Sequence, residues 1–296
     1  MSQRYENPPQ PEQVDARDGH PLAEVGVLVG GVVAIGVAIA AAVTFGATWI
    51  APKIPFRYEQ QLADGVFREQ KTPLNQDDLG RERALRALAG RLAATMDLPA
   101  DMSVTVHYDG GKVLNAFASL GGHIVVYRGL IECMPNEDAL AAVIAHEIAH
   151  VRHRHPAASL GRGVALSLIL SMAGMSTSSS VANRVVGAAP SLALLKFSRD
   201  QETEADADAM RAVVKVYGHV GGVQDLFEAF RNARPDAPGG VQFLLTHPVT
   251  AERLRRVASA AAREGWSTAG ERAPLAEPLK RVDGGRPTKT TGVPRC

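Results

Sequence analysis

Two histidines and a glutamate stand together in the segment His146-Glu147-Ile148-Ala149-His150. Residues four apart on a helix share one face, so the two imidazoles can bind one zinc ion at about 2.0 to 2.1 Å each. Glu147 projects about 100° further round the helix, where its carboxylate can reach a metal-bound water without being a ligand. The segment therefore predicts one zinc ion per chain, with two ligands and a general base.

The sequence around this segment predicts the helix that the chemistry requires. Glu137 and Asp138 suit a first helical turn after Asn136, and Pro156 ends the pattern. The alternative is an amphipathic helix whose histidines are surface residues, but such a triplet arises by chance in roughly one or two chains in a hundred. The apolar face of the predicted helix is formed by Leu140, Val143, Ile144, Ile148 and Val151.

A catalytic zinc ion needs a third protein ligand and one open position. Glu202 and Asp206 lie four apart downstream, so one can ligate the metal while the other braces a histidine ring nitrogen. An acidic run of this kind is more often a solvated helix face, so the pattern alone does not select them. His153 is expected to be a partly exposed polar residue, because roughly 10 Å of helical rise separates it from His146.

Composition bounds the class of protein and its partners. The chain has 296 residues, 46% of them hydrophobic, with 32 Lys and Arg against 31 Asp and Glu. This balance indicates a folded protein and predicts no nucleic-acid partner. The two cysteines, Cys133 and Cys296, indicate no disulfide framework, although a bridge between them stays open.

The N-terminal region predicts a membrane anchor. Residues 1–21 are a polar tail, residues 22–51 a transmembrane helix and residues 52–78 a linker. Residues 25–51 carry no charged side chain and would span roughly 40 Å as a helix. A cleavable signal peptide is the alternative, but the apolar stretch is long and the preceding residues are net acidic.

The remainder predicts a mainly helical α+β domain over residues 79–265. Asn75 to Asp78 can cap a helix over residues 79–96. Runs at 103–108, 113–118 and 123–127 suggest a small antiparallel sheet beside the zinc-binding helix. A further apolar run at 164–175 suits a buried helix, a serine-rich joint at 176–180 could cover the cleft, and residues 266–296 are predicted to be disordered.

Several segments together resemble one family of zinc metallopeptidases. Residues 145–151 with Arg154-His155 resemble the HtpX-like peptidase family, which also contains the CAAX prenyl endopeptidases and the mitochondrial Oma-type protease. Residues 115–118 and 121–126, the run Glu202-Thr203-Glu204-Ala205-Asp206, and Thr246-His247-Pro248 with Arg253 match in order and spacing. The resemblance covers roughly residues 79–258 and implies a zincin-type metalloprotease domain.

The resemblance assigns roles that the pattern leaves open. It implies that Glu202 is the third zinc ligand and that Asp206 supports a ligand histidine. It makes His247 a candidate to stabilise the oxyanion, and Asn115, Ala116, Phe117 and Ala118 a candidate edge strand for the substrate backbone. A loop histidine before a helix-starting proline and an ordinary core strand are the alternatives.

With a single predicted span, the chain looks like the single-anchor or periplasmic branches of the family, which disfavours prenylated substrates. The expected function is a membrane-anchored zinc endopeptidase that serves protein quality control on misfolded or misassembled envelope proteins, by Glu147-assisted attack of zinc-bound water. The expected location is a bacterial inner membrane with a periplasmic domain, although the basic residues around the span lean slightly to the cytoplasm. The rivals are a non-catalytic tethered chaperone or scaffold with a structural zinc, and a zinc-independent binding module.

Overall fold

The computed structural model describes residues 21–50, 53–69, 73–161, 197–233, 243, 246–248, 251–280, 282–283 and 286–287. The apolar run at 164–175 and the serine-rich joint at 176–180 lie outside these residues. The helices are α1 (Pro21–Ile50), α2 (Phe56–Glu69), α3 (Gln76–Ala93), α4 (Arg128–Cys133), α5 (Glu137–Arg152), α9 (Arg199–Tyr217), α10 (Gly221–Asn232) and α12 (Ala251–Glu264), with 3-10 turns η2 (Leu120–Gly122) and η3 (Glu277–Leu279).

The strands form a small mixed sheet. They are β1 (Thr105–Asp109), β2 (Ala116–Ala118) and β3 (His123–Tyr127), in the order β1-β3-β2, and a separate short pair joins β4 (Val282–Asp283) to β5 (Arg286–Pro287). β3 runs parallel to β1 and antiparallel to β2. The prediction of an antiparallel sheet is therefore wrong for one pair, β1 with β3. β2 follows β1 in the chain but lies at the far edge of the sheet, and the next strand, β3, takes the place between them.

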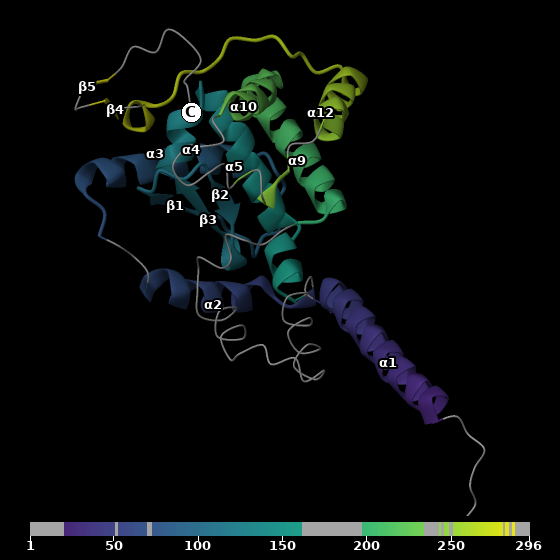
Figure 1. The fold of residues 1–296 in the computed structure, drawn as a ribbon. Coiled ribbons are helices and arrows are strands. Elements are labelled where there is room, and N and C mark those ends of the chain that lie inside the picture. The colour runs from purple at the N-terminus through teal and green to yellow at the C-terminus, as the bar shows by residue number, and fades with distance from the viewer. Residues whose placement is uncertain are drawn as a thin grey trace, which may run out of the picture.

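Helix α5 lies at the centre of the fold (Figure 1). It packs against α9 and α10 on one side and against α3 and β2 on the other. Every residue from Asp138 to Val151 is buried. A helix that is apolar nearly all round is buried on every side, so the polar side chains of the 146–150 segment have only protein groups around them.

Capping side chains mark the first residues of α3, α5 and α9. Asn75 caps α3, as predicted, by accepting a hydrogen bond from the Asp78 N–H at 2.9 Å. Asn136 caps α5 in the same way. Ser198 and Gln201 form a reciprocal capping box at the start of α9. The capping box fixes the start of α9 within one turn of the predicted ligand Glu202.

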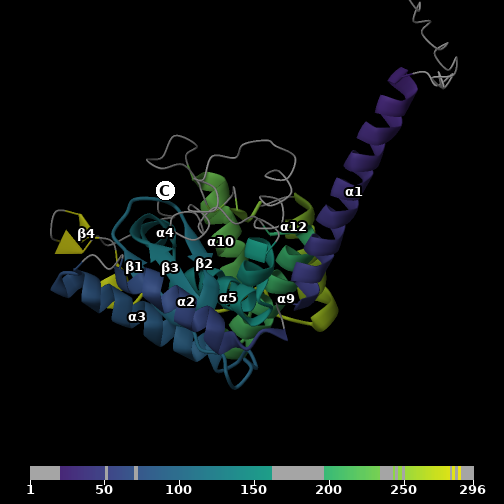
Figure 2. The same ribbon diagram turned by 90° about the horizontal axis from the view of Figure 1, so that it is seen from below.

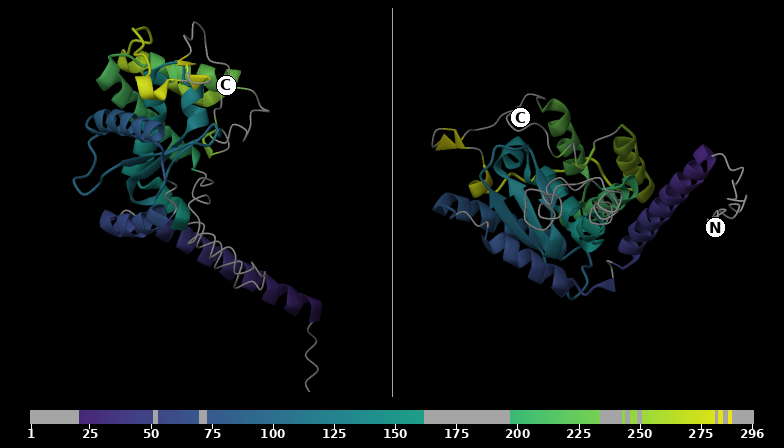
Figure 3. Two further views of the ribbon diagram at one scale, coloured as in Figure 1. Left: turned by 90° about the vertical axis from the view of Figure 1, so that its left-hand side faces the viewer. Right: turned by 60° about the horizontal axis from the view of Figure 1, so that its bottom comes forward.

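The segment predicted to be a linker contains α2, which is docked on the domain. Phe56 is 1% exposed, and the Arg154 Nε donates to Glu59 Oε1 at 2.9 Å. Gly121 has a φ of +68°, and a Cβ there would lie 2.8 Å from the Cα of Gln60, so only glycine allows this approach. In Figures 2 and 3, α2 lies along one end of the domain and α1 projects away from it.

The segment after α12 corrects a second prediction. Residues 266–280, predicted to be part of a disordered tail, run over the start of α5, where the Glu137 N–H donates to the Ala273 carbonyl at 2.9 Å. Leu279 is 2% exposed. The sequence shows no periodicity here because the segment is extended and is held by scattered apolar side chains and backbone pairing.

Two further predictions concern the membrane and the cysteines. No helix, searched over the described residues, is both long and apolar enough to cross a membrane, so the predicted span stays a prediction. Cys133 is 1% exposed and disulfide-bonded, although its position in the sequence left a bridge possible without supporting one. Cys296 lies outside the described residues.

Candidate active site

Four side chains from three parts of the chain meet beside α5. His146 and His150 come from α5, Glu202 from the first turn of α9, and His247 from the short described segment before α12; one ligand atom of each lies within 4.8 Å of the others. The His146 Nε2 atom is 3.0 Å from His150 Nε2 and 3.5 Å from Glu202 Oε2. His150 Nε2 is 3.5 Å from Glu202 Oε1. The structure thus brings together the three predicted ligands.

These donors fit a zinc ion. Ligands about 2.0 to 2.2 Å from a tetrahedral ion are separated from one another by roughly 3.3 to 3.6 Å, close to the observed 3.0 to 3.5 Å. Two buried atoms of the cluster, Glu202 Oε2 and His247 Nε2, make no hydrogen bond among the described residues. Burial lowers the pKa of His150 well below its ordinary value, so this imidazole is neutral, the form that binds a metal.

His247 occupies a position that sequence analysis did not anticipate. Its Nδ1 lies 3.2 Å from His146 Nε2 and 2.8 Å from Glu202 Oε1, which is within reach of a shared metal ion. The sequence separation of 101 residues from His146 carries no spacing signal. With His247 the cluster has four protein donors, the number found in closed structural zinc sites.

Glu147 lies between the four-residue cluster and the sheet. It is fully buried, and its Oε2 accepts a hydrogen bond from the Ala118 N–H at 2.7 Å. Its Oε1 makes no hydrogen bond among the described residues and lies 3.5 Å from His247 Nε2. Burial raises the pKa of this carboxyl, which moves it toward the range in which a general base can take and return a proton.

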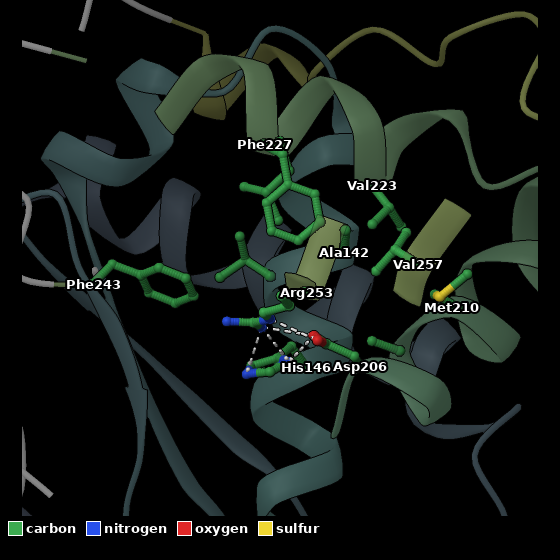
Figure 4. Close-up of a pocket in the computed structure, with 12 residues that line it drawn as sticks. Ala142, His146, Asp206, Met210, Val223, Phe227, Phe243, Arg253 and Val257 are labelled. Atoms are coloured by element: carbon green, nitrogen blue, oxygen red, sulfur yellow. Dashed lines mark hydrogen bonds and ion pairs between the residues drawn. The ribbon is translucent and has the colours of Figure 1, made fainter. Parts of the chain in front are cut away.

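Asp206 and Arg253 support His146 from behind, as the close-up in Figure 4 shows. Asp206 Oδ1 lies 3.1 Å from His146 Nδ1, and Arg253 donates to both Asp206 oxygens at 2.6 Å. Arg253 NH1 also lies 3.0 Å from Glu202 Oε2. Although burial opposes it, hydrogen bonds to Asp206 and Glu202 raise the pKa of His146 to about 9, so a metal ion must displace a proton from this ring.

Sequence analysis named Arg253 without giving it a role. Its only signal is a basic residue six positions after His247, in a helix that is rich in arginine. Behind His146, the same guanidinium lines a small cavity of about 20 Å³, just large enough for a water molecule. The cavity is otherwise lined mostly by apolar side chains of α5, α9, α10 and α12, among them Val143, Met210, Val223, Phe227 and Val257.

The predicted substrate strand lies beside the site. β2 is an edge strand of the described sheet, and Ala118 faces Ile124 of β3 on one side. Asn115 is fully buried, yet both polar atoms of its amide lack a hydrogen-bond partner among the described residues. The Phe243 N–H donates to the Leu114 carbonyl at 3.1 Å. Phe243 therefore pairs with the backbone just before β2.

Aromatic rings stack on two of the histidines. Phe197 lies 3.9 Å from the His150 ring at an interplanar angle of 20°. Phe243 lies 4.6 Å from the His247 ring at 27°. These stacked rings limit the orientations of the two imidazoles and exclude water from one side of the cluster.

Two histidines one helical turn apart, a glutamate between them, and a carboxylate from a following helix define the class of zinc metallopeptidases. The chain belongs to peptidase family M48, whose family model matches residues 80–261. Members of this family depend on zinc, and the His146, His150, Glu202 and His247 cluster could bind such an ion.

Curated relatives agree with this class. The chain is 30% identical over 159 residues to the mitochondrial metalloendopeptidase OMA1 of Schizosaccharomyces pombe, covering 53% of this chain and 46% of the relative. It is 27% identical over 213 residues to the beta-barrel assembly-enhancing protease of Yersinia pestis, covering 66% and 43%. The chain therefore spans less than half the length of these relatives.

Proposed function

We propose that this chain is a membrane-anchored zinc endopeptidase that hydrolyses peptide bonds in misfolded or misassembled envelope proteins. One observation carries the proposal: the buried Glu147 carboxylate joins the metal cluster to the edge strand through its 2.7 Å bond from Ala118. A base thus stands between the ligands and the strand proposed to take the substrate. A purely structural zinc site has no need of a base in that position.

The ligands are His146, His150 and Glu202, and zinc bound there would supply a Lewis acid and an activated water. Glu147 Oε1, which makes no hydrogen bond among the described residues, accepts the proton of the attacking water and returns it to the leaving amine. The bond from Ala118 to Oε2 holds the carboxylate in one orientation during both transfers. His247 Nε2 makes no hydrogen bond among the described residues and is proposed to stabilise the developing oxyanion when it carries a hydrogen.

The substrate is proposed to lie against residues 115–118. An extended peptide that adds to an edge strand receives main-chain hydrogen bonds whatever its sequence, which suits a protease for misfolded proteins. The buried Asn115 amide, which has no hydrogen-bond partner among the described residues, can bond to the same peptide backbone.

The anchor is proposed to be residues 25–51, which carry no charged side chain. Leu22, Val27 and Leu28 of α1 are 86%, 77% and 68% exposed. An exposed apolar surface of this kind is typical of a segment that contacts a membrane or another protein. The relatives named for beta-barrel assembly support envelope substrates and a periplasmic domain on a bacterial inner membrane. Membrane fractionation and a C-terminal reporter fusion test the anchor and its side.

The decisive experiment is the Glu147→Gln variant. The amide keeps the size of the side chain and the bond from Ala118 but cannot accept a proton, so we expect zinc to stay bound and casein cleavage to be lost. Glu228→Gln, an exposed residue of α10, is the matched control and should cleave normally. Normal cleavage by Glu147→Gln would overturn the assignment of the base.

The rival with a specific observation in its favour is a tethered chaperone with a structural zinc, since His247 completes a set of four donors. His247→Ala separates the two. If the histidine stabilises the oxyanion, cleavage falls about 10²-fold and zinc stays bound. If it closes a structural site, zinc affinity falls and the wild type shows no cleavage to lose.

A further inference from the structure

Behind His150 lies a pair of side chains to which the proposed function gives no role. His155 is 4% exposed, and its Nδ1 lies 2.8 Å from His150 Nδ1. Its Nε2 lies 3.4 Å from an Oε2 of Glu204, a residue whose side chain is 59% exposed. A chain of polar groups thus runs from a proposed zinc ligand to the protein surface.

The positions of the protons in this chain follow from the cluster. The Nε2 atom of His150 faces His146 and Glu202 at 3.0 and 3.5 Å, so Nε2 is the nitrogen that would bind the metal. A neutral imidazole then carries its hydrogen on Nδ1. That hydrogen has an acceptor only if His155 Nδ1 is unprotonated, which puts the hydrogen of His155 on Nε2, facing the Glu204 carboxylate.

The backbone holds His155 in this place. The helix α5 ends at Arg152, and Arg154 adopts a left-handed conformation with a φ of +56°, which costs free energy for any residue other than glycine. Arg154 is held there by its bond to Glu59 at 2.9 Å. This sharp turn brings the ring of His155 to within hydrogen-bond distance of a residue one helical turn before it.

We propose that His155 is a positioning residue that, together with Glu204, fixes the tautomer and ring orientation of His150 and thereby raises the affinity of the site for zinc. The proposal rests on the proposed role of His150 as a zinc ligand. Groups that hydrogen-bond a ligand histidine in this way typically contribute 10- to 100-fold to metal affinity. His155 does not touch the substrate.

The test measures zinc affinity by competition with a chelator, on the purified full-length chain in detergent. His155→Phe keeps a buried ring but removes the acceptor, and we expect it to weaken zinc binding 10- to 100-fold. His155→Gln restores an acceptor oxygen and should recover part of the loss. Glu204→Ala, at an exposed position that tolerates truncation, should weaken binding by a few-fold.

The matched control is His153→Phe. The His153 ring stacks on His155 at 5.4 Å, but its Nε2 lies 2.9 Å from Asp208, and no side-chain hydrogen bond or ring stacking joins it to His150 among the described residues. It should bind zinc as the wild type does. The Co²⁺-substituted protein provides a second readout, because its visible spectrum should change in His155→Phe and not in His153→Phe.

Unchanged zinc affinity in both His155→Phe and Glu204→Ala would overturn the proposal, and Glu204→Ala decides it if His155→Phe does not fold. Loss of a second zinc ion per chain, rather than weakening of the first, would instead make His153, His155 and Glu204 a separate metal group and also overturn it. A wild type that binds no zinc would contradict the proposed function itself, so the two failures are distinct.

Discussion

The two ligand histidines of α5 are supported in different ways. His146 rests on a carboxylate, Asp206, which a buried arginine holds with two hydrogen bonds of 2.6 Å. His150 rests on a neutral ring, His155, whose outer partner is a largely exposed glutamate. The first support is charged and closed to solvent, whereas the second ends in water.

This difference has energetic consequences. Charge-assisted bonds in a buried environment are strong but leave a costly unpaired charge when one partner is removed. The second support loses less when its outer member, the exposed Glu204 carboxylate, is removed, because water can take its place. We therefore expect damage to the His146 support to affect folding as well as zinc binding, and damage to the His150 support to affect zinc binding alone.

The largest expected effect is that of Arg253→Met. The substitution leaves the Asp206 carboxylate buried without its counter-ion, so the free energy of unfolding should fall by about 3 to 5 kcal/mol. Urea denaturation of the metal-free chain measures this loss. Arg256→Met, on the same helix but with a half-exposed side chain, is the control, and equal midpoints for the two variants would contradict the comparison.

A smaller effect is expected when the two supporting carboxylates are neutralised. Asp206→Asn should weaken zinc binding 10- to 100-fold, because its oxygen no longer carries the charge that favours His146 as a donor. Glu204→Gln should change it by less, since the amide retains an acceptor oxygen. Added NaCl sharpens the contrast: any effect of Glu204→Gln should shrink with salt and that of Asp206→Asn should persist. Chelator competition at two NaCl concentrations measures the zinc affinity of both variants.

The smallest effect concerns Asp208, which lies on α9 outside both supports and contacts Arg152 and His153. Although burial opposes it, the hydrogen bonds to His153 and Arg152 lower the pKa of this carboxyl from 3.8 to about 2. Because the folded pKa is the lower one, the contribution to stability is present above pH 3.8 and is lost as the pH falls toward 2. Because its arginine partners are partly exposed and solvent screens the ion pairs, Asp208→Asn should cost about 1 kcal/mol at pH 7, without loss of zinc affinity.

That difference between Asp208→Asn and wild type should narrow at pH 3. Urea midpoints of the two proteins at pH 7 and pH 3 measure it. A gap that stays constant between the two pH values would show that the ion pairs of Asp208 do not stabilise the fold.

The parts of the site that sequence could predict are those with local signals. His146, Glu147 and His150 share one helical turn, and the Asn136 cap that begins their helix is visible in the sequence. Glu202 and Asp206 share the next such pattern, and the structure brings both to the cluster. In each case, helical geometry converts the spacing into a shared face, but for Glu202 and Asp206 only the family resemblance selected the pair from the acidic run.

The parts that could not be predicted depend on contacts across the chain. His247 and Arg253 reach His146 from 101 and 107 residues away; no periodicity marks such a distance, so only the family resemblance pointed to His247 and nothing indicated its contact with the ligands. The parallel pairing of β1 with β3 could not be predicted either, because the residues of a single strand do not indicate the direction of its neighbour. The contact of His155 with His150 depends on the left-handed backbone conformation of Arg154, and an arginine in the sequence does not indicate that conformation.

The zinc cluster draws its donors from α5 and α9, which are joined by a long stretch of chain between His150 and Glu202. An ion held by both helices closes that stretch into a loop, much as a covalent cross-link does. Closing a loop of about 50 residues removes roughly 4 kcal/mol of chain entropy from the unfolded state in the cross-link model. The supply of zinc would then govern how long the folded protein persists, as well as whether it can cut.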